Sequence, residues 1–206
     1  MVSAASRSRN CTGCPAIEGH HREHAVFGAS ASCVAVNPSD MAVALCALEA
    51  IVQVHGPGGA RSIHVGELYR LPGDEPQRDT VLQHGELITA VDLPALPVAA
   101  RSHYRKVRDR ASYAFALVSV AVAARIERGS VRDVRIAFGG LAAKPWRARA
   151  AEQMLRGAPA TGETAVRAAE TELAAARPLR GNAFKVKLAQ GALAAVIREL
   201  TRGATS

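Results

Sequence analysis

The sequence is poor in aromatic residues, which make up 4% of its 206 residues. Proteins that bind single-stranded nucleic acids rely heavily on bases stacking on aromatic side chains. No helix-turn-helix, RNP or zinc-finger pattern accompanies the few aromatic residues. The sequence therefore argues against nucleic acid as a ligand, although the net charge of +8 and a pI of about 9.9 favour anionic partners.

Long apolar runs are also missing, since no stretch approaches the roughly 20 residues that span a bilayer. Residues 1–10 are small, polar and basic, and they lack the apolar segment of a secretory signal. We therefore expect no membrane insertion. The compartment stays open between cytoplasm and periplasm, because a protein without its own signal can be exported bound to a signal-bearing partner.

Acidic residues are scarce in the middle of the chain. Residues 101–156 hold 13 Lys and Arg against four Asp and Glu. We expect this basic surface to face either acidic partner subunits or an anionic cofactor.

Cysteine is rare outside one N-terminal stretch, which holds three of the four cysteines together with three histidines: Cys11, Cys14, Cys33, His20, His21 and His24. On spacing alone, a Cys3His zinc site is the first interpretation. An iron–sulfur cluster is the second, because thiolates suit both metals. Unliganded surface cysteines are the third. The fourth cysteine, Cys46, is expected to be a buried, inert thiol.

Residues 1–36 are expected to be irregular, with regular structure from Asn37 onward. Asn37 is predicted to cap a helix that ends at the glycine-rich turn of residues 56–59. Its apolar stripe would comprise Met41, Leu45, Leu48 and Val52. Short strands are predicted at residues 61–65 and 86–93.

A boundary is expected at residues 94–100, and the part beyond it predicts an α+β layer structure. Alternating apolar residues predict strands at residues 103–108, 114–126 and 134–138. Helical patterns follow at residues 145–155, 163–176 and 182–200.

Several motifs then form one pattern along the chain, including Asn37-Pro38-Ser39-Asp40 directly after the cysteine stretch. The other matching runs are residues 13–19, 22–28, 31–35, 41–45, 70–73, 85–91, 104–116, 139–147 and 184–185. Together they resemble the FAD-binding subunit of the molybdenum hydroxylases, the family of xanthine dehydrogenases, carbon monoxide dehydrogenases and aldehyde oxidoreductases. The likeness is greatest to the flavin subunit of periplasmic aldehyde oxidoreductases, which carries an additional 4Fe–4S cluster.

This resemblance implies an α+β fold in three parts. Residues 1–36 would be a partial iron–sulfur insertion, and residues 37–97 the second half of a PCMH-type FAD-binding domain. Residues 98–206 would be a domain like the C-terminal domain of carbon monoxide dehydrogenase flavoproteins, with a three-stranded antiparallel sheet and helices. The family's upstream glycine-rich loop and Gly-Asn motif, which grip the FAD pyrophosphate, have no counterpart here. We therefore expect an N-terminally truncated subunit that binds FAD weakly by itself.

The resemblance also implies a role in electron transfer. The partners would be a large subunit with the molybdenum cofactor, which oxidises the substrate, and a small subunit with 2Fe–2S clusters. This oxidoreductase subunit would pass their electrons to FAD and a final acceptor. Two alternatives stay open: a structural docking subunit that has lost flavin and cluster, and a small zinc-binding module.

Five residues match positions of the family's cofactor sites. Asp40 corresponds to an aspartate that contacts the ribityl hydroxyls, Ile88 to an apolar residue beside the isoalloxazine ring, and Lys106 to a lysine near the flavin edge. Each residue also has a purely structural interpretation. Asp40 would be a carboxylate at the start of a helix, Ile88 a core residue of a strand, and Lys106 a solvated surface charge. Cys14 and Cys33 match the third and fourth ligands of the 4Fe–4S cluster.

Overall fold

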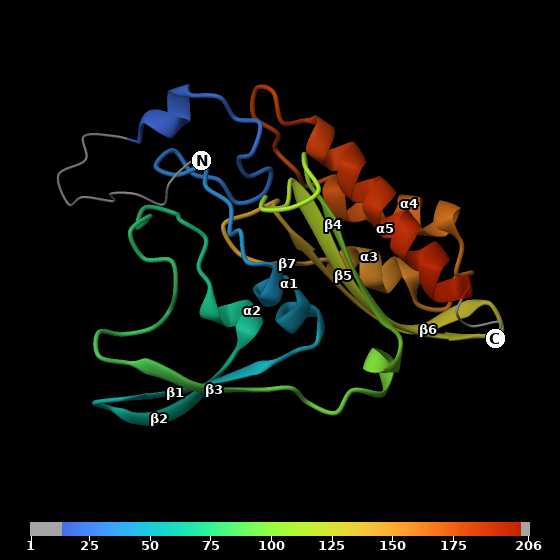
Figure 1. The fold of residues 1–206 in the computed structure, drawn as a ribbon, viewed down its shortest axis with the longest axis horizontal. Helices are drawn as coiled ribbons and strands as arrows, with labels where there is room; N and C mark the ends of the chain where they lie inside the picture. Colours follow the sequence, from blue (N-terminus) through green and yellow to red (C-terminus); the bar gives the residue numbers. More distant parts are fainter. Residues whose placement is uncertain (1–13, 203–206) are drawn as a thin grey trace.

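The computed structural model of the chain describes residues 14–202, which form two antiparallel sheets and the helices around them (Figure 1). This mixed arrangement of sheets and helices confirms the predicted fold class. None of the helices in the described residues is long and apolar enough to cross a membrane. The short helical segments outside the main layers are η1 (Pro15–Glu18), α2 (Val65–Leu68) and η2 (Pro97–Ala100).

The first sheet has three strands in the order β2-β1-β3. Their bounds are Ile51–Gly56 for β1, Gly59–His64 for β2 and Leu87–Asp92 for β3. Val52 and Val54 of β1 are buried, and with Val43 and Cys46 of α1 (Asp40–Ala47) they form a small core. Strand β3 lies at the edge of this sheet, and all six of its residues are exposed.

The single helix predicted from Asn37 to the glycine-rich turn is wrong. Helix α1 ends at Ala47, and Glu49 leaves the helical conformation with a φ of 54°. The β-branched residues that follow belong to the hairpin of β1 and β2. The turn of this hairpin is the glycine-rich segment at which the helix was predicted to end. The helix cap is Ser39, whose hydroxyl accepts from the Ala42 N–H at 3.1 Å, while Asn37 accepts from Ser39 N at 2.9 Å.

The second sheet has the strand order β4-β5-β6-β7. Its strands are Ser102–Val107, Val118–Glu127, Ser130–Gly139 and Trp146–Arg147, and the helices after it are α3 (Arg149–Leu155), α4 (Gly162–Leu173) and α5 (Phe184–Arg202). Val120 and Val122 of β5 belong to the large core with these helices, whereas Ala121 packs with the α1 core. Both faces of β5 are therefore covered, which explains its nearly continuous apolar sequence.

Three long strands and three helices thus follow the prediction for the second half of the chain. The difference is β7, which adds a two-residue fourth strand where a helix start was expected. Trp146 pairs with Phe138 of β6, and its ring stacks on Phe27 with 4.3 Å between the centroids. Its indole N–H donates to Glu172 Oε1 at 2.8 Å, which holds α4 against this strand.

The N-terminal segment is attached to the second half through a buried lysine. Lys185 at the start of α5 is fully buried, and its ammonium donates to the carbonyls of Glu23, His24 and Gly140 at 2.9, 2.9 and 2.8 Å. Asn182, also fully buried, donates to the carbonyl of Ala25 at 3.3 Å. The irregular segment is therefore held by side chains that satisfy its backbone carbonyls.

Candidate functional site

Two of the predicted site residues meet where α1 begins beside β4. Asp40 is the first residue of α1, so its side chain lies at the positive end of the helix. The Oδ2 atom of Asp40 lies 2.7 Å from the Lys106 ammonium. The carboxylate is 38% exposed and the lysine side chain 21%, so both can still reach a ligand. We call this ion pair the Asp40–Lys106 pair.

Tyr104 completes the site, and the sequence interpretation did not single it out. Its hydroxyl donates to Asp40 Oδ1 at 2.6 Å. A tyrosine hydroxyl is protonated at neutral pH, and burial and this hydrogen bond raise the pKa of Tyr104 above its ordinary value, so the hydroxyl stays a donor to Asp40 in alkaline solution as well. The signal was present in the sequence, because Tyr104 and Lys106 stand two residues apart on one strand and hence share a face.

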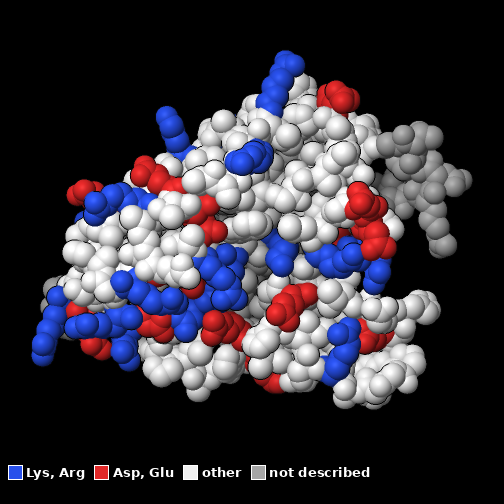
Figure 2. All heavy atoms as spheres, turned by 180° about the vertical axis from the view of Figure 1, so that it is seen from behind, with Lys and Arg blue, Asp and Glu red and all other residues white. Residues whose placement is uncertain are grey.

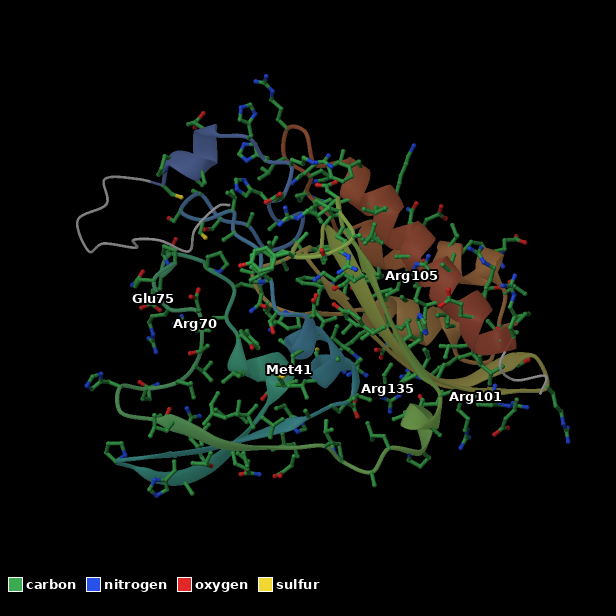
Figure 3. All side chains as sticks on the ribbon, viewed as in Figure 1. Met41, Arg70, Glu75, Arg101, Arg105 and Arg135 are labelled. Carbon is green, nitrogen blue, oxygen red and sulfur yellow. The ribbon has the colours of Figure 1, made fainter. Side chains whose placement is uncertain are left out.

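The opposite face of β4 carries a different set of contacts. Arg105 reaches from β4 to α5, where its Nη1 donates to Glu199 Oε1 at 2.7 Å (Figure 3). His103 lies 2.7 Å from the other Glu199 oxygen. These residues tie β4 to the helix layer, on the face of the strand turned away from the Asp40–Lys106 pair.

A narrow crevice borders Asp40 and shows how closely the elements approach there. Its nine lining residues come from the start of α1, the start of β5 and the end of β6: Asn37, Pro38, Ser39, Asp40, Val43, Ala116, Ser119, Gly139 and Gly140. A Cβ on Gly139 would collide with Ser119 Oγ and Val43, and Gly140 adopts a φ of 73°. The crevice leaves no room for even a water molecule, so a cofactor would have to lie outside it, along the exposed part of the pair.

Ile88 lies on β3 of the three-stranded sheet, so the structure does not bring it into contact with the Asp40–Lys106 pair. It pairs with Val54 of β1, and both side chains therefore point to the same side of the sheet. Val54 is buried, but Ile88 is 48% exposed and its neighbour Val91 42%. The apolar layer of this sheet thus continues to the edge strand without a cover, which leaves a surface that fits a flat apolar ring.

Asp40, Lys106 and Ile88 offer the kinds of contact that fit a flavin cofactor, but they do not enclose it. An ionised carboxylate has about four acceptor positions, and the described contacts of Asp40 use two, so ligand hydroxyls can occupy the rest. The ammonium of Lys106 supplies positive charge, and the exposed side of β3 supplies apolar contact. Asp40 therefore suits the hydroxyls of a polyol, Lys106 suits an electron-rich ring edge, and the exposed side of β3 suits the face of a ring.

The cysteines do not assemble into a metal site within the described residues. Cys14 is half-buried, Cys33 is buried, and both are free thiols. No group of three or more Cys, His, Asp or Glu side chains in residues 14–202 could hold a metal ion. Because a 4Fe–4S cluster needs four ligands, this part of the chain does not fit a complete cluster. Cys11 lies outside the described residues.

The remaining residues of this segment have structural roles. His24 is buried, and its Nδ1 lies 3.0 Å from the Nδ1 of His21, so it is engaged in a contact within the loop. Burial lowers the pKa of His24, and the neighbouring His21 and Lys185 add to this shift. Cys46 is buried in α1, as predicted, and its burial raises the pKa of the thiol, which disfavours the reactive thiolate.

The basic surface predicted for the middle of the chain is largely ion-paired. On the rear face, Lys and Arg gather toward the side of the β5–β6 hairpin, with Asp and Glu among them (Figure 2). Glu127 contacts Arg125 and Arg132 there, and Asp133 contacts Arg135 and Arg156. Exposed pairs of this kind contribute little stability, and they also reduce the positive charge that this surface offers to a partner.

Two sequence families match the chain. Residues 18–96 match the FAD binding domain in molybdopterin dehydrogenase, and residues 102–200 match the CO dehydrogenase flavoprotein C-terminal domain. A relative in Escherichia coli K12, the aldehyde oxidoreductase FAD-binding subunit PaoB, is 47% identical over 190 residues, or 91% of this chain and 56% of PaoB. The chain spans about half the length of the curated relatives it matches.

Solved structures show the same fold. Quinoline 2-oxidoreductase from Pseudomonas putida 86 superposes with a TM-score of 0.67 over 92% of this chain and 61% of its own, at 22% identity. Carbon monoxide dehydrogenase from Hydrogenophaga pseudoflava superposes with a TM-score of 0.66 over 79% of this chain and 59% of its own, at 26% identity.

Proposed function

We propose that this chain, which belongs to the family of the FAD-binding subunits of molybdenum hydroxylases, binds FAD and relays electrons through it. The observation that carries this proposal is the Asp40–Lys106 pair, a carboxylate and an ammonium 2.7 Å apart on the open side of a narrow crevice. When bound, FAD supplies the capacity to accept and release electrons. The residues of this chain bind and orient it.

Each site residue has a distinct part in that binding. Asp40 would accept hydrogen bonds from the ribityl hydroxyls, while Tyr104 holds its carboxylate in place. Lys106 would place a positive charge where negative charge develops on the ring as electrons arrive, which favours their uptake. Ile88 would contact the ring with its exposed apolar side chain.

The chain would act within a larger assembly, as the relationship to aldehyde oxidoreductase and carbon monoxide dehydrogenase subunits suggests. A large subunit would carry the molybdenum cofactor and oxidise the substrate. A small subunit would carry 2Fe–2S clusters and deliver the electrons. Within this chain, residues 37–97 would contribute to the FAD domain and residues 98–206 would form the C-terminal domain, after an N-terminal insertion in residues 1–36.

The test is the visible spectrum and metal content of the chain purified with these partner subunits. We expect flavin absorption in the assembled complex that contains this chain. A complex without flavin would instead support a docking subunit that has lost its cofactor. Stoichiometric zinc without iron in this chain purified alone would support a zinc-binding module.

An iron–sulfur cluster is a further proposal, with Cys14 and Cys33 as two of its ligands. Support comes from the resemblance alone, because the described residues do not complete a ligand set. If the proposal holds, Cys14→Ser and Cys33→Ser each lower the iron content of the purified complex. The matched control is Cys46→Ala, which removes a buried thiol of α1 and leaves iron unchanged. Full iron content in Cys14→Ser would refute the assignment.

A further inference from the structure

Helix α1 ends in a turn that favours glycine but carries a glutamate. The Ala50 N–H donates to the Leu45 carbonyl at 3.0 Å, and the Glu49 N–H donates to the Cys46 carbonyl at 3.3 Å. These two bonds form a Schellman motif, in which the residue after the helix adopts a left-handed conformation. Glu49 has that conformation, with a φ of 54°. Glycine adopts it without steric cost and is the usual residue there, so the backbone alone does not account for a glutamate.

The side chain of Glu49 connects the end of α1 to the second sheet. Its Oε1 atom accepts from Arg135 Nε of β6 at 3.1 Å and from Arg147 Nη2 of β7 at 3.2 Å. Arg135 lies beside α1 in Figure 3. Arg147 also donates from Nη1 to the Cys46 carbonyl in the last turn of α1, at 3.2 Å. The arginines of the second sheet therefore hold both the carboxylate and the helix end, where positive charge is itself stabilising.

The two arginines are themselves held in place by other carboxylates. Arg147 forms an ion pair with Glu152 of α3, whose side chain is only 4% exposed, and Arg135 forms one with Asp133. The side chains of Arg147 and Arg135 are 13% and 19% exposed. Charge-assisted hydrogen bonds with this much burial are stronger than the exposed ion pairs of the β5–β6 hairpin. They give Glu49 two ordered donors to which the end of α1 is attached.

The opposite end of α1 carries Asp40, so this attachment bears on the candidate site. Helix α1 has eight residues and is about 12 Å long, and it packs on β5 and β6. A tilt of about 5° around its Glu49 end would move its Asp40 end by about 1 Å over that length. The 2.7 Å contact between Asp40 and Lys106 would then exceed hydrogen-bond distance. The geometry of the Asp40–Lys106 pair therefore depends on where Glu49 holds the helix.

We propose that Glu49 is a positioning residue, which fixes the orientation of α1 and thereby the contact between Asp40 and Lys106. It lies at the far end of the helix from Asp40, so it acts through the pair and not by touching a ligand there. Its effect on FAD binding rests on the proposed function. Its effect on the contact between Asp40 and Lys106 does not.

The main variant is Glu49→Gly in the full chain. Glycine keeps the left-handed turn and removes only the carboxylate, so the fold is retained. We expect FAD, titrated by its fluorescence, to bind about three- to tenfold more weakly, which corresponds to about one weakened hydrogen bond. Glu49→Gln should bind FAD more tightly than Glu49→Gly, because its amide oxygen still accepts from the arginines.

The matched control is Arg128→Gly in the turn between β5 and β6. Arg128 is exposed and has a φ of 51°, so this variant also replaces a left-handed residue by glycine, but away from α1. We expect it to bind FAD like the wild type. Equal FAD affinities for Glu49→Gly and Arg128→Gly would overturn the proposal.

A double-mutant cycle distinguishes positioning from a general loss of stability. If Glu49 acts through Asp40, Glu49→Gly weakens FAD binding in the wild-type background and causes no further loss in the Asp40→Ala background. A merely structural role would weaken FAD binding by the same factor in both backgrounds. That second result would contradict a positioning role.

A measurement without FAD separates this proposal from the proposed function. The backbone amide resonances of Tyr104 and Lys106, which contact Asp40 from β4, are recorded by heteronuclear NMR of the FAD-free chain. We expect Glu49→Gly to shift both resonances and Arg128→Gly to leave them in place. Unchanged resonances in Glu49→Gly mean that the proposal is wrong, even if the chain binds FAD. Shifted resonances in a chain that binds no FAD support the positioning role, and the proposed function then fails by itself.

Discussion

Replacing Asp40 by alanine is expected to weaken FAD binding by about 10- to 100-fold. The variant removes the carboxylate that would accept from the ribityl hydroxyls, and hydrogen bonds to a charged group contribute roughly 1.5–3 kcal/mol. It also leaves the Tyr104 hydroxyl and the Lys106 ammonium without their shared acceptor. The unpaired ammonium then loses the contact that positions it.

The measurement is a titration of FAD fluorescence with wild type and variants. Asp40→Asn should lose less than Asp40→Ala, because the amide oxygen still accepts one hydrogen bond. The control is Asp74→Ala, which removes an exposed carboxylate in the loop between α2 and β3 and leaves FAD binding unchanged. Equal affinities for Asp40→Ala and Asp74→Ala would exclude Asp40 from the site.

Replacing Lys185 by methionine is expected to lower the free energy of unfolding by about 2–4 kcal/mol. The change leaves the buried carbonyl of Gly140 and the part-buried carbonyl of Glu23 without the ammonium that now donates to them, and each unsatisfied buried group costs roughly 1–3 kcal/mol. The control is Lys187→Met on the same helix, where the side chain is exposed and the expected change is within about 0.5 kcal/mol. Denaturant unfolding of both variants measures the difference, and equal stabilities would refute a structural role for Lys185.

The same lysine predicts a pH dependence with a definite sign. Burial lowers the pKa of Lys185 to about 8, below its ordinary value of 10.5. Between these values the unfolded chain holds the proton and the folded chain has released it, so stability rises with pH. The stability difference between wild type and Lys185→Met should therefore increase from pH 8 to about pH 10.5. A difference that stays constant over this range would contradict the lowered pKa.

The second half of the fold was predictable from the sequence, because its elements are long and regular. The alternation around Val134 and Ile136 and the helical pattern of residues 182–200 predict β6 and α5 within a few residues. In the first half, the strands predicted at residues 61–65 and 86–93 correspond to β2 and β3. The long helix was wrong, since Met41, Leu45 and Val52 fit a helical stripe even though the chain turns at Glu49. Short apolar runs do not distinguish helix from strand, and only pairing with β2 decided it.

The site was predictable in part. Asp40, Ile88 and Lys106 came from the family resemblance, but their geometry depends on contacts between distant elements. Helix α1 packs on β5 and β6 of the second sheet, which places Asp40 beside Lys106 of the neighbouring β4, and no local pattern encodes that packing. Tyr104 needed the same information. The predicted zinc site is not formed within residues 14–202 for a related reason. Cysteines that are close in sequence are not thereby held close together in space.

The most direct test of the account is a titration of FAD into the chain, alone and assembled with its partner subunits. We predict saturable binding with one FAD per chain in the assembly and weaker, micromolar binding to the chain alone, both reduced by Asp40→Ala. An assembly that takes up no FAD, or binding that is indifferent to both Asp40→Ala and Lys106→Ala, would contradict the assignment of this chain as a flavin-dependent electron relay.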